Sequence, residues 1–517
     1  MAFVADNAFS MNRFAERLLG PVDRLVVALT DPARREYAVI GVLFGYVVLW
    51  TLYAVLAKAS QDIHPDMSEV ATWSRELALG YPKHPPLSAW LTAAWFALFP
   101  ADDWSFYLLA MVVPAVALWL AWRLSAGYLD DSKRVLGLAL LMLVPFFNFH
   151  AMKFNANTVL LPLWAATTLC FLRSYEQRSA MWAALAGVCA AGAMLGKYWS
   201  VILLAGLAIA ALADRRRAAY FRSTAPWVTI AAGALAIAPH VVWLMRNDFE
   251  PFSYATAVHA GTLWGSLKSA AGYLVGSAGY AALPVLLVFG AVRPGQAVLN
   301  DMLWPPAAQR RLVAVSFWAP LLLPALAAPL TGVEVTSLWS MSAWTLLPVV
   351  LLSSPLVALG RQSMLAIVAA AIVLPVVMVA VAPFIASAIH RAGVAPAMAH
   401  SHLLAERVAH EWRSVTGQPL RLVGGEGDLS YGVAFYHPDR PSAFPDFNRS
   451  GAPWASWERA RRQGIAIVCF ANNPTCPLAA QAQGLTGPRI EVDIARSHLG
   501  VPGKPERYAI ILVPPRR

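Results

Sequence analysis

Charged residues are scarce in this chain. Lys, Arg, Asp and Glu make up 13% of its 517 residues, whereas hydrophobic residues make up 58%. Soluble domains carry about 25% charged residues. Because the polar side chains are too few to cover a core of this size, the composition excludes a soluble globular protein. It predicts a polytopic α-helical membrane protein.

Cysteine is also rare, with four residues in the whole chain. Cys170 and Cys189 lie in apolar runs, where we expect them to serve as packing residues. Cys469 and Cys476 lie in the polar C-terminal tail. They would form a short disulfide if that tail were outside the cytoplasm, and would remain two free thiols otherwise. The sequence leaves both alternatives open.

Several functional signatures are missing. The net charge is +11, but the basic residues are scattered between apolar runs, which argues against nucleic-acid binding. No internal repeat of the kind that builds many transporters is present. We expect no cleavable signal peptide, because residues 1–36 are polar and basic and the first apolar run begins at Tyr37. The arginines of 1–36 predict a cytoplasmic N-terminal segment.

Apolar stretches of spanning length, about 20 residues, predict about eleven transmembrane helices. They lie near 37–57, 104–123, 135–150, 157–173, 180–196, 198–213, 224–244, 272–292, 312–331, 336–357 and 363–388. The run 86–99 is shorter, so we expect it to lie along the membrane surface. This choice puts the loops 124–134, 174–179, 214–223, 293–311 and 358–362 on one side, and each of them contains Arg or Lys. The positive-inside rule makes that side cytoplasmic.

The same topology predicts the domains. Residues 37–390 form the transmembrane part, with a first outer loop at 58–103, and residues 391–517 form a periplasmic tail. The tail alternates helix-like stretches (403–415, 455–463, 477–483) with strand-like ones (419–424, 464–470, 489–494, 507–513). This pattern predicts a small α/β domain. Residues 435–447 are expected to form a loop. The tail shows neither a nucleotide-binding glycine motif nor metal-ligand spacing.

Charges gather in the first outer loop, directly after the first apolar run. Charges beside a bilayer are costly and often mark function. The loop contains Asp66, Glu69, Lys83 and His84. Outside this loop, Lys153 and Lys197 are cations on the predicted outer face, against the positive-inside trend. A lysine in the middle of the run 181–213 would cost about 2.5–3.5 kcal/mol, so two helices turning at Lys197 are expected.

The pattern of this loop resembles the GT-C glycosyltransferases, and within them family 39, the protein-mannosyltransferase and aminoarabinose-transferase-like enzymes of bacterial inner membranes. The resemblance rests on an acid after the first span followed by a His-Pro-Pro-Leu motif, and it extends over the membrane part. Its residues are Asp66, Glu69, Trp73, Gly80-Tyr81, Lys83-His84-Pro85-Pro86-Leu87, Lys153, Asn155, Asn157, Gly196-Lys197-Tyr198, Pro239-His240, Trp243 and Asn247-Asp248-Phe249. The resemblance implies a polyprenyl-phosphate sugar donor, an acceptor on the outer leaflet and a periplasmic C-terminal domain.

The chain departs from the family pattern at two positions. Many relatives have Asp-Glu as the first acidic pair, whereas this chain has Asp66-Met67, with Glu69 two residues further on. Many relatives also have an acid before the fourth span, where this chain has Asn157. The second departure puts in doubt any metal site that needs that acid. No cofactor is therefore predicted, and a divalent cation is left open.

Sugar transfer from a phosphate leaving group sets the roles. The transition state resembles an oxocarbenium ion, a carboxylate must take the acceptor proton, and cations must stabilise the departing phosphate. Asp66 is the predicted general base, and Glu69, the second predicted catalytic residue, would position the acceptor or would be solvated. The predicted ligands of the lipid phosphate are Lys83, His84, Lys153 and Lys197. The predicted substrate-binding residues are Trp73, Tyr81, Asn157, His240, Arg246 and Asn247.

The resulting hypothesis is a multi-pass enzyme of the bacterial inner membrane with a periplasmic active site. It would transfer a sugar to lipid A, to the lipopolysaccharide core or to another envelope glycan. A lipid or sugar transporter is the alternative, supported by prolines inside the predicted spans. A membrane-anchored binding protein that acts through its tail is a third reading. The sequence leaves the sugar, the acceptor and the oligomeric state undetermined.

Overall fold

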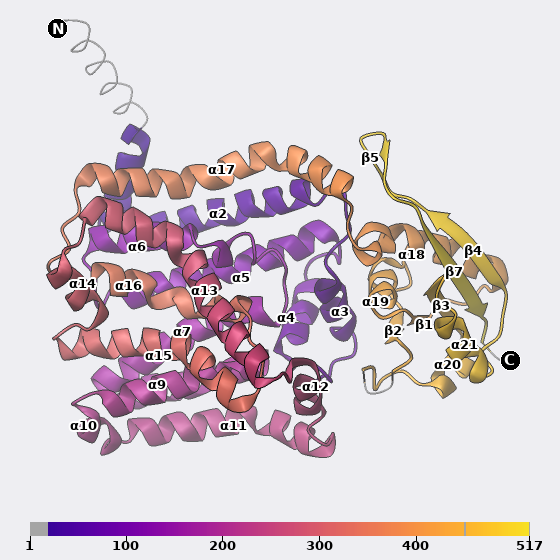
Figure 1. Cartoon of the computed structure of the whole chain (residues 1–517), viewed down its shortest axis with the longest axis horizontal. Helices are drawn as coiled ribbons and strands as arrows, with labels where there is room; N and C mark the ends of the chain where they lie inside the picture. Colours follow the sequence, from indigo (N-terminus) through magenta and orange to yellow (C-terminus); the bar gives the residue numbers. More distant parts are fainter. Residues whose placement is uncertain (1–18, 449–450, 516–517) are drawn as a thin grey trace, which may run out of the picture.

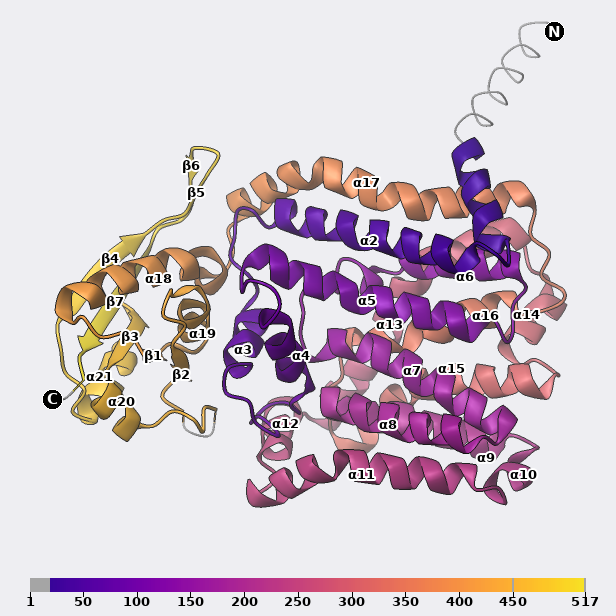
Figure 2. The same ribbon diagram turned by 180° about the vertical axis from the view of Figure 1, so that it is seen from behind.

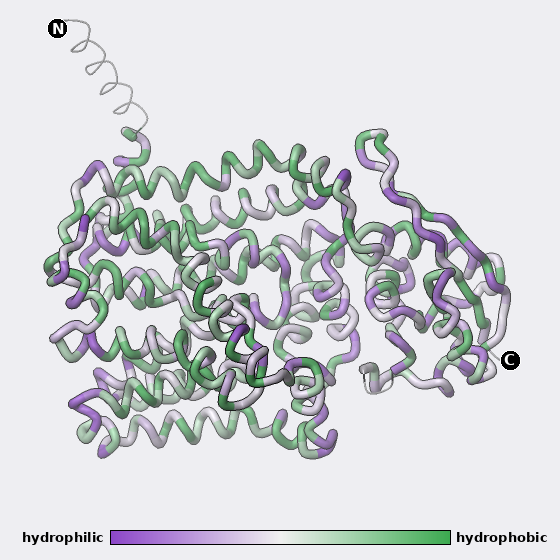
Figure 3. Tube along the Cα trace, viewed as in Figure 1, coloured by the Kyte–Doolittle hydropathy of each residue, from purple (hydrophilic) through white to green (hydrophobic). Residues whose placement is uncertain are grey.

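A computed structural model describes residues 19–448 and 451–515 of the chain. They form a bundle of roughly parallel helices and an α/β domain at one end of it (Figures 1 and 2). The hydropathy of the trace differs between the two parts: the bundle is mostly apolar along its length, whereas the α/β domain alternates polar and apolar segments (Figure 3). The six long apolar helices described below are typical of a multi-pass membrane protein.

The first half of the bundle runs from α2 to α9. Its helices are α2 (Arg35–Ala57), α3 (Pro65–Trp73), α4 (Leu87–Phe96), α5 (Asp103–Ser125), α6 (Asp131–Met142), α7 (Ala156–Gln177), α8 (Ala180–Gly196) and α9 (Val201–Ala213). Two 3-10 segments, η1 (Pro145–Phe147) and η2 (Tyr198–Ser200), precede α7 and α9. The break at η2 confirms the turn expected at Lys197.

The second half runs from α10 to α17. Its elements are α10 (Arg217–Phe221), α11 (Ala225–Arg246), α12 (Glu250–His259), α13 (Leu263–Val292), α14 (Gln296–Leu303), α15 (Ala308–Thr331), the 3-10 segment η3 (Ser337–Leu346), α16 (Leu347–Leu352) and α17 (Arg361–Ala392).

Small residues allow close packing of helices α8 and α11. A Cβ on Gly187 of α8 would lie 2.2 Å from the carbonyl oxygen of Thr229 on α11, so only glycine permits this approach.

Six of the described helices are long and apolar enough to cross a membrane: α2, α5, α11, α13, α15 and α17. The other predicted spans coincide with shorter or less apolar helical segments, so the count of eleven remains a prediction. The short run 86–99 contains the ten-residue helix α4. It lies with α3 and α12 at the end of the bundle that faces the α/β domain (Figures 1 and 2).

The α/β domain begins with α18 after α17. Its elements are α18 (Pro396–Val415), β1 (Leu422–Gly425), α19 (Gly427–Tyr436), β2 (Ser442–Pro445), α20 (Trp457–Gln463), β3 (Ile465–Phe470), α21 (Thr475–Ala482), β4 (Arg489–Ile494), β5 (Ser497–His498), β6 (Val501–Pro502) and β7 (Glu506–Val513). The five-stranded sheet has the order β2-β1-β3-β7-β4, and β5 and β6 form a separate hairpin.

The sheet is mixed. Strand β1 pairs in parallel with β2 and β3, with Val423 opposite Ala443 and Ala466, whereas β7 pairs antiparallel with β3 and β4. The structure therefore bears out the expected fold class, a helical membrane protein with a small C-terminal α/β domain. Cys469 and Cys476 form a disulfide between β3 and α21, which settles the alternative that the sequence left open.

One local prediction is wrong. Residues 435–447 were expected to form a loop, but they include the end of α19 and all of β2. Pro445 is accommodated in β2 because this strand is at the edge of the sheet and Pro445 is its last residue.

Polar contacts dock the α/β domain on the first outer loop. Arg75 donates to the carbonyl oxygens of Ala434 (3.0 Å) and Pro441 (3.3 Å). Tyr436 donates to Asp103 at 2.9 Å, and buried Asp62 forms an ion pair with Arg496. The first outer loop and the α/β domain therefore form one continuous surface around the charged residues.

Candidate active site

The acid predicted as the base lies in the first turn of α3. Pro65 is the first residue of this helix, and His64 caps it by accepting the backbone N–H of Asp66 through Nδ1 at 3.1 Å. Proline at the first helical position and an acid in the first turn both favour a helix start. The sequence His-Pro-Asp therefore fixes the position of Asp66 locally.

Two residues from the segment before α7 hold the Asp66 carboxylate. Lys153 Nζ lies 3.2 Å from Oδ2, and the side-chain amide of Asn155 donates to the same oxygen at 2.9 Å. Asn155 is itself fixed, because its Oδ1 caps α7 by accepting the backbone N–H groups of Asn157 and Thr158. The Asp66 side chain is still 42% exposed. It is therefore oriented by its neighbours and remains reachable by a substrate.

The charges around Asp66 set its protonation. Burial raises its pKa, but the positive charge of Lys153, the neighbouring His64 and the hydrogen bond from Asn155 outweigh burial. The pKa of Asp66 therefore lies below its ordinary value. Burial in turn lowers the pKa of His64. A carboxylate that is ionised at neutral pH can accept a proton.

Glu69, one turn further along α3, has different surroundings. Its side chain is 12% exposed and its Oε1 lies 2.6 Å from Lys83 Nζ. The Tyr431 hydroxyl, from α19 of the α/β domain, also hydrogen-bonds with Glu69. Burial raises the pKa of Glu69, and the ammonium of Lys83 opposes this shift only in part. These contacts make Glu69 a positioning group for Lys83.

Lys197 and Asn157 were predicted separately and meet in the structure. Lys197 Nζ donates to Asn157 Oδ1 at 2.7 Å and lies 5.3 Å from the centre of the Trp339 ring. Burial lowers the pKa of Lys197 to about 8, and Asp66 opposes this shift. Because the hydrogen-bond partner of this ammonium is a neutral amide oxygen, its charge is available for an anion.

His84 lies near these lysines but does not carry a charge. Burial lowers its pKa to about 3, and the positive charges of Lys197 and Lys83 contribute to the shift. His84 is therefore neutral near pH 7. As a phosphate ligand, His84 could therefore contribute a hydrogen bond but no positive charge.

Two aromatic residues predicted to stack on a sugar are packing residues instead. Trp73 and Tyr81 are fully buried and stack on each other, with ring centres 4.9 Å apart and planes 5° from parallel. They form a small core with Tyr431 and Ala434 of α19. Because their ring faces are covered by protein, the structure corrects this prediction.

The predicted residues on α11 also lie outside the cluster around Asp66. His240 is buried and bridges the Tyr198 hydroxyl (2.9 Å) and the carbonyl oxygen of Leu79 (2.6 Å). Asn247 donates to the carbonyl oxygen of Trp243 on its own helix, and Arg246 is exposed at the end of α11. The contact with Leu79 holds the first outer loop against α11, so we assign His240 a structural role, and Asn247 caps the end of α11.

Asp428 was missed by the sequence reasoning. It lies in the first turn of α19, and it interacts electrostatically with Lys83, Asp66 and His64. The available signal was its place directly after buried strand β1, because ligand sites often form at the carboxyl ends of parallel strands. The α/β domain thus contributes an acid to the same cluster.

A polar cavity of about 220 Å³ opens beside Asp66. Its lining includes His64, Lys153, His150, Lys58 and Asp62. Within residues 19–448 and 451–515, no group of three or more His, Cys, Asp or Glu residues could hold a metal ion. The Asp66 carboxylate beside several ammonium groups can support proton abstraction.

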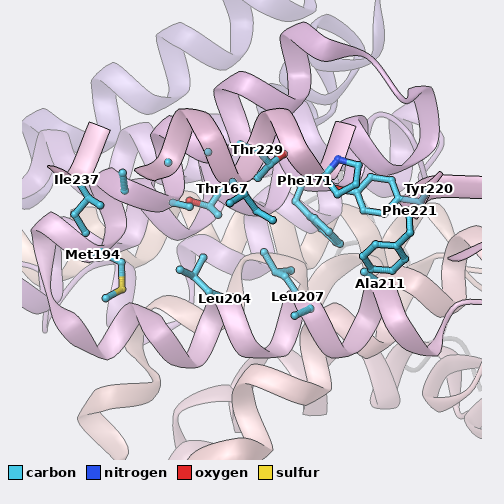
Figure 4. Close-up of a pocket in the computed structure, with 18 residues that line it drawn as sticks. Thr167, Phe171, Met194, Leu204, Leu207, Ala211, Tyr220, Phe221, Thr229 and Ile237 are labelled. Atoms are coloured by element: carbon cyan, nitrogen blue, oxygen red, sulfur yellow. The ribbon is translucent and has the colours of Figure 1, made fainter. Parts of the chain in front are cut away.

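An apolar cavity of about 400 Å³ runs along α8, α9 and α11 (Figure 4). Tyr220 and Phe221 line one end, and Met194 and Ile237 line the other. Met194 lies three positions before Lys197, and Ile237 lies three positions before His240. The cavity therefore extends along the bundle toward the end that carries the charged cluster.

Comparisons with known proteins find a family model and a relative that each match part of the chain. The family model for dolichyl-phosphate-mannose-protein mannosyltransferases matches residues 83–243. The lipopolysaccharide core galacturonosyltransferase RgtB of Rhizobium johnstonii is 28% identical over 228 residues, which are 43% of this chain and 45% of RgtB. The match thus spans less than half of the length of this relative.

Solved structures extend the likeness to the whole fold. ArnT from Cupriavidus metallidurans bound to undecaprenyl phosphate superimposes with a TM-score of 0.62 at 13% identity, over 90% of this chain and 97% of that one. The apo state of the same protein gives a TM-score of 0.58 at 12% identity, over 90% and 98%. At this identity the likeness shows the fold.

Proposed function

We propose that the chain is a membrane glycosyltransferase of the GT-C type, which transfers a sugar from a polyprenyl-phosphate donor to an envelope glycolipid. The observation that carries the proposal is the half-exposed carboxylate of Asp66, held by Lys153 and Asn155 beside further lysines. The activity for which RgtB is named supports a lipopolysaccharide acceptor, and the undecaprenyl phosphate bound in the ArnT structure supports a polyprenyl-phosphate donor.

In the proposed reaction, Asp66 takes the proton of an acceptor hydroxyl. The oxygen of that hydroxyl attacks the anomeric carbon of the sugar. The bond between that carbon and the phosphate oxygen breaks at the same time. Its electron pair leaves with polyprenyl phosphate, whose growing negative charge is met by Lys153 and Lys197. General-base catalysis contributes about 10²–10⁴-fold, and aimed positive charges add to it.

We assign the donor tail to the apolar cavity of Figure 4. An isoprenoid chain is a branched hydrocarbon, and it would lie along α8 and α11 with its phosphate at the end near Lys197. Lys83, Lys153 and Lys197 bring three ammonium groups into one cluster, although Glu69 and Asp66 pair with the first two. These ammonium groups support an acidic sugar such as a hexuronic acid, in keeping with the activity for which RgtB is named.

We place this site on the periplasmic face of the inner membrane. The disulfide between Cys469 and Cys476 supports this placement, because disulfides persist in oxidising compartments. The α/β domain that contains it lies at the same end of the bundle as α3 (Figure 1). The positive-inside rule supports the same orientation.

The test is a direct assay for a new glycosidic bond. Purified protein in detergent receives a polyprenyl-phosphate sugar with a radiolabelled sugar and a lipopolysaccharide core acceptor. We expect label in the acceptor with the wild type and none with Asp66→Asn. Asp493→Asn, which removes one acid of an exposed ion pair on β4, is the matched control and should retain activity. Movement of unmodified substrate across vesicles without a new bond would instead indicate a transporter.

A further inference from the structure

The hairpin formed by β5 and β6 is separate from the main sheet of the α/β domain. It projects from the domain to the edge of the molecule, beside the end of α17 (Figures 1 and 2). None of the catalytic roles proposed above uses it. Its composition and its position therefore need an explanation of their own.

The tip of this hairpin is apolar and exposed. Leu499 is 80% exposed and Val501 is 50% exposed. Leu499 also has a φ of 49°, in the left-handed region. Two-residue turns of this kind favour asparagine or glycine at such a position, and a bulky residue there is strained. A leucine at this position exposes a large apolar side chain and strains the backbone, without any contribution to a core.

The hairpin is fixed to a membrane-spanning helix. His390, in the last turn of α17, has its Nε2 2.9 Å from the carbonyl oxygen of Val501, and its ring lies 5.6 Å from that of His498. The apolar stretch of α17 ends at Ile389. Since His390 and Arg391 mark where this helix leaves the hydrocarbon layer, the attached hairpin lies at the depth of the lipid headgroups.

The charges beside the tip match an anionic surface. Arg391 and Lys504 are both exposed next to the hairpin. Long basic side chains at the ends of spanning helices reach toward lipid phosphates. An apolar tip flanked by cations is the pattern of segments that lie in the membrane interface.

We infer that the hairpin 497–502 is a membrane-contact element that inserts Leu499 and Val501 among the headgroups of the bilayer. Arg391 and Lys504 bind lipid phosphates on either side of it. The partner is the lipid surface, because the hairpin continues directly from the end of a spanning helix. The contact ties the α/β domain to the bilayer next to the docking contact between Arg496 and Asp62, and it does not depend on the proposed reaction.

Depth-dependent quenching tests this inference in the full chain. Cys170 and Cys189 are replaced by Ala, Leu499→Cys is labelled with an environment-sensitive fluorophore, and the protein is reconstituted in vesicles of phosphatidylethanolamine and phosphatidylglycerol. Leu478→Cys on α21, which replaces a leucine that is 57% exposed, is the matched control within the same domain. Circular dichroism and gel filtration check that both variants are folded.

We expect the label at 499 to be blue-shifted and quenched several-fold more by lipids with a nitroxide near the headgroup than the label at 478. Equal quenching at the two positions, or none at 499, would overturn the inference. A blue shift at 499 that requires a second protein would also overturn it. A failure of the glycosyl-transfer assay would leave this result unaffected, so the two proposals are tested separately.

Discussion

Two acids on helix α3 lie one turn apart and have opposite surroundings. Asp66 is 42% exposed and has a pKa below its ordinary value. Glu69 is 12% exposed, is bound by Lys83 and Tyr431, and has a raised pKa. The same chemical group therefore takes two roles because its neighbours differ. The exposed acid suits proton transfer, and the buried one holds a lysine in place.

The largest expected effect is a loss of turnover when Asp66, and not Glu69, is replaced. Asp66→Asn removes the proposed base and should lower kcat by about 10²–10⁴-fold, the usual contribution of a general base. The melting temperature should stay close to that of the wild type, because Asn can still meet the amide of Asn155. Turnover and thermal melting of the purified variant measure both quantities. A variant with more than a tenth of wild-type kcat would exclude Asp66 as the base.

Glu69→Gln should do the reverse, with a larger effect on stability than on chemistry. Breaking a buried ion pair costs about 3–5 kcal/mol, but the Lys83 side chain is 35% exposed. Solvent screening therefore reduces the expected loss to about 1–3 kcal/mol. Thermal melting in detergent, next to Asp66→Asn, checks the contrast. If Glu69→Gln abolished turnover without lowering the melting temperature, the assigned roles would be wrong.

Lys197 allows a test of the phosphate contact through pH. Its pKa is lowered to about 8, so its positive charge is complete below that pH and is lost as pH rises through it. Affinity for polyprenyl phosphate should fall about tenfold between pH 7 and pH 9.5. Lys197→Arg should keep its affinity over this range, since arginine stays charged. Equilibrium binding at several pH values gives the result, and identical profiles for the two proteins would argue against a direct contact.

The smallest expected effect concerns the acid that the α/β domain contributes. Asp428 interacts electrostatically with Lys83 and Asp66, so it lies near the proposed phosphate site. Its negative charge should repel an incoming phosphate. Two charges near a protein surface interact by about 1 kcal/mol or somewhat more, so Asp428→Asn should tighten polyprenyl-phosphate binding about 3- to 10-fold. Calorimetry of binding checks the direction. Weaker binding would mean that Asp428 contacts the ligand itself.

The comparison of the two acids also shows what could be predicted from the sequence. Apolar runs and loop charges predicted the helical bundle, the tail domain and the convergence of Asp66, Lys153 and Lys197, because membrane insertion restricts where charges can lie. The meeting of Asn157 with Lys197 follows from the same restriction, since both residues flank helix ends at one surface. These predictions depend on patterns of residues that are close together in the sequence.

The remaining parts depend on contacts between distant segments. The aromatic residues Trp73 and Tyr81 were predicted to bind substrate. The α/β domain covers them instead. The position of Asp428 depends on how α19 packs on α3, and the sequence gives no register for that contact. The difference between Asp66 and Glu69 arises from the same packing, through Tyr431.

The pH dependence of kcat/KM in Lys153→Met tests the central claim most directly. The base must be ionised, so activity is present above the pKa of Asp66 and is lost as pH falls through it. Lys153 keeps that pKa below its ordinary value, and its removal should move the acidic limb of the profile to higher pH by about one unit or more. An acidic limb at the same pH in Lys153→Met and wild type would contradict the account.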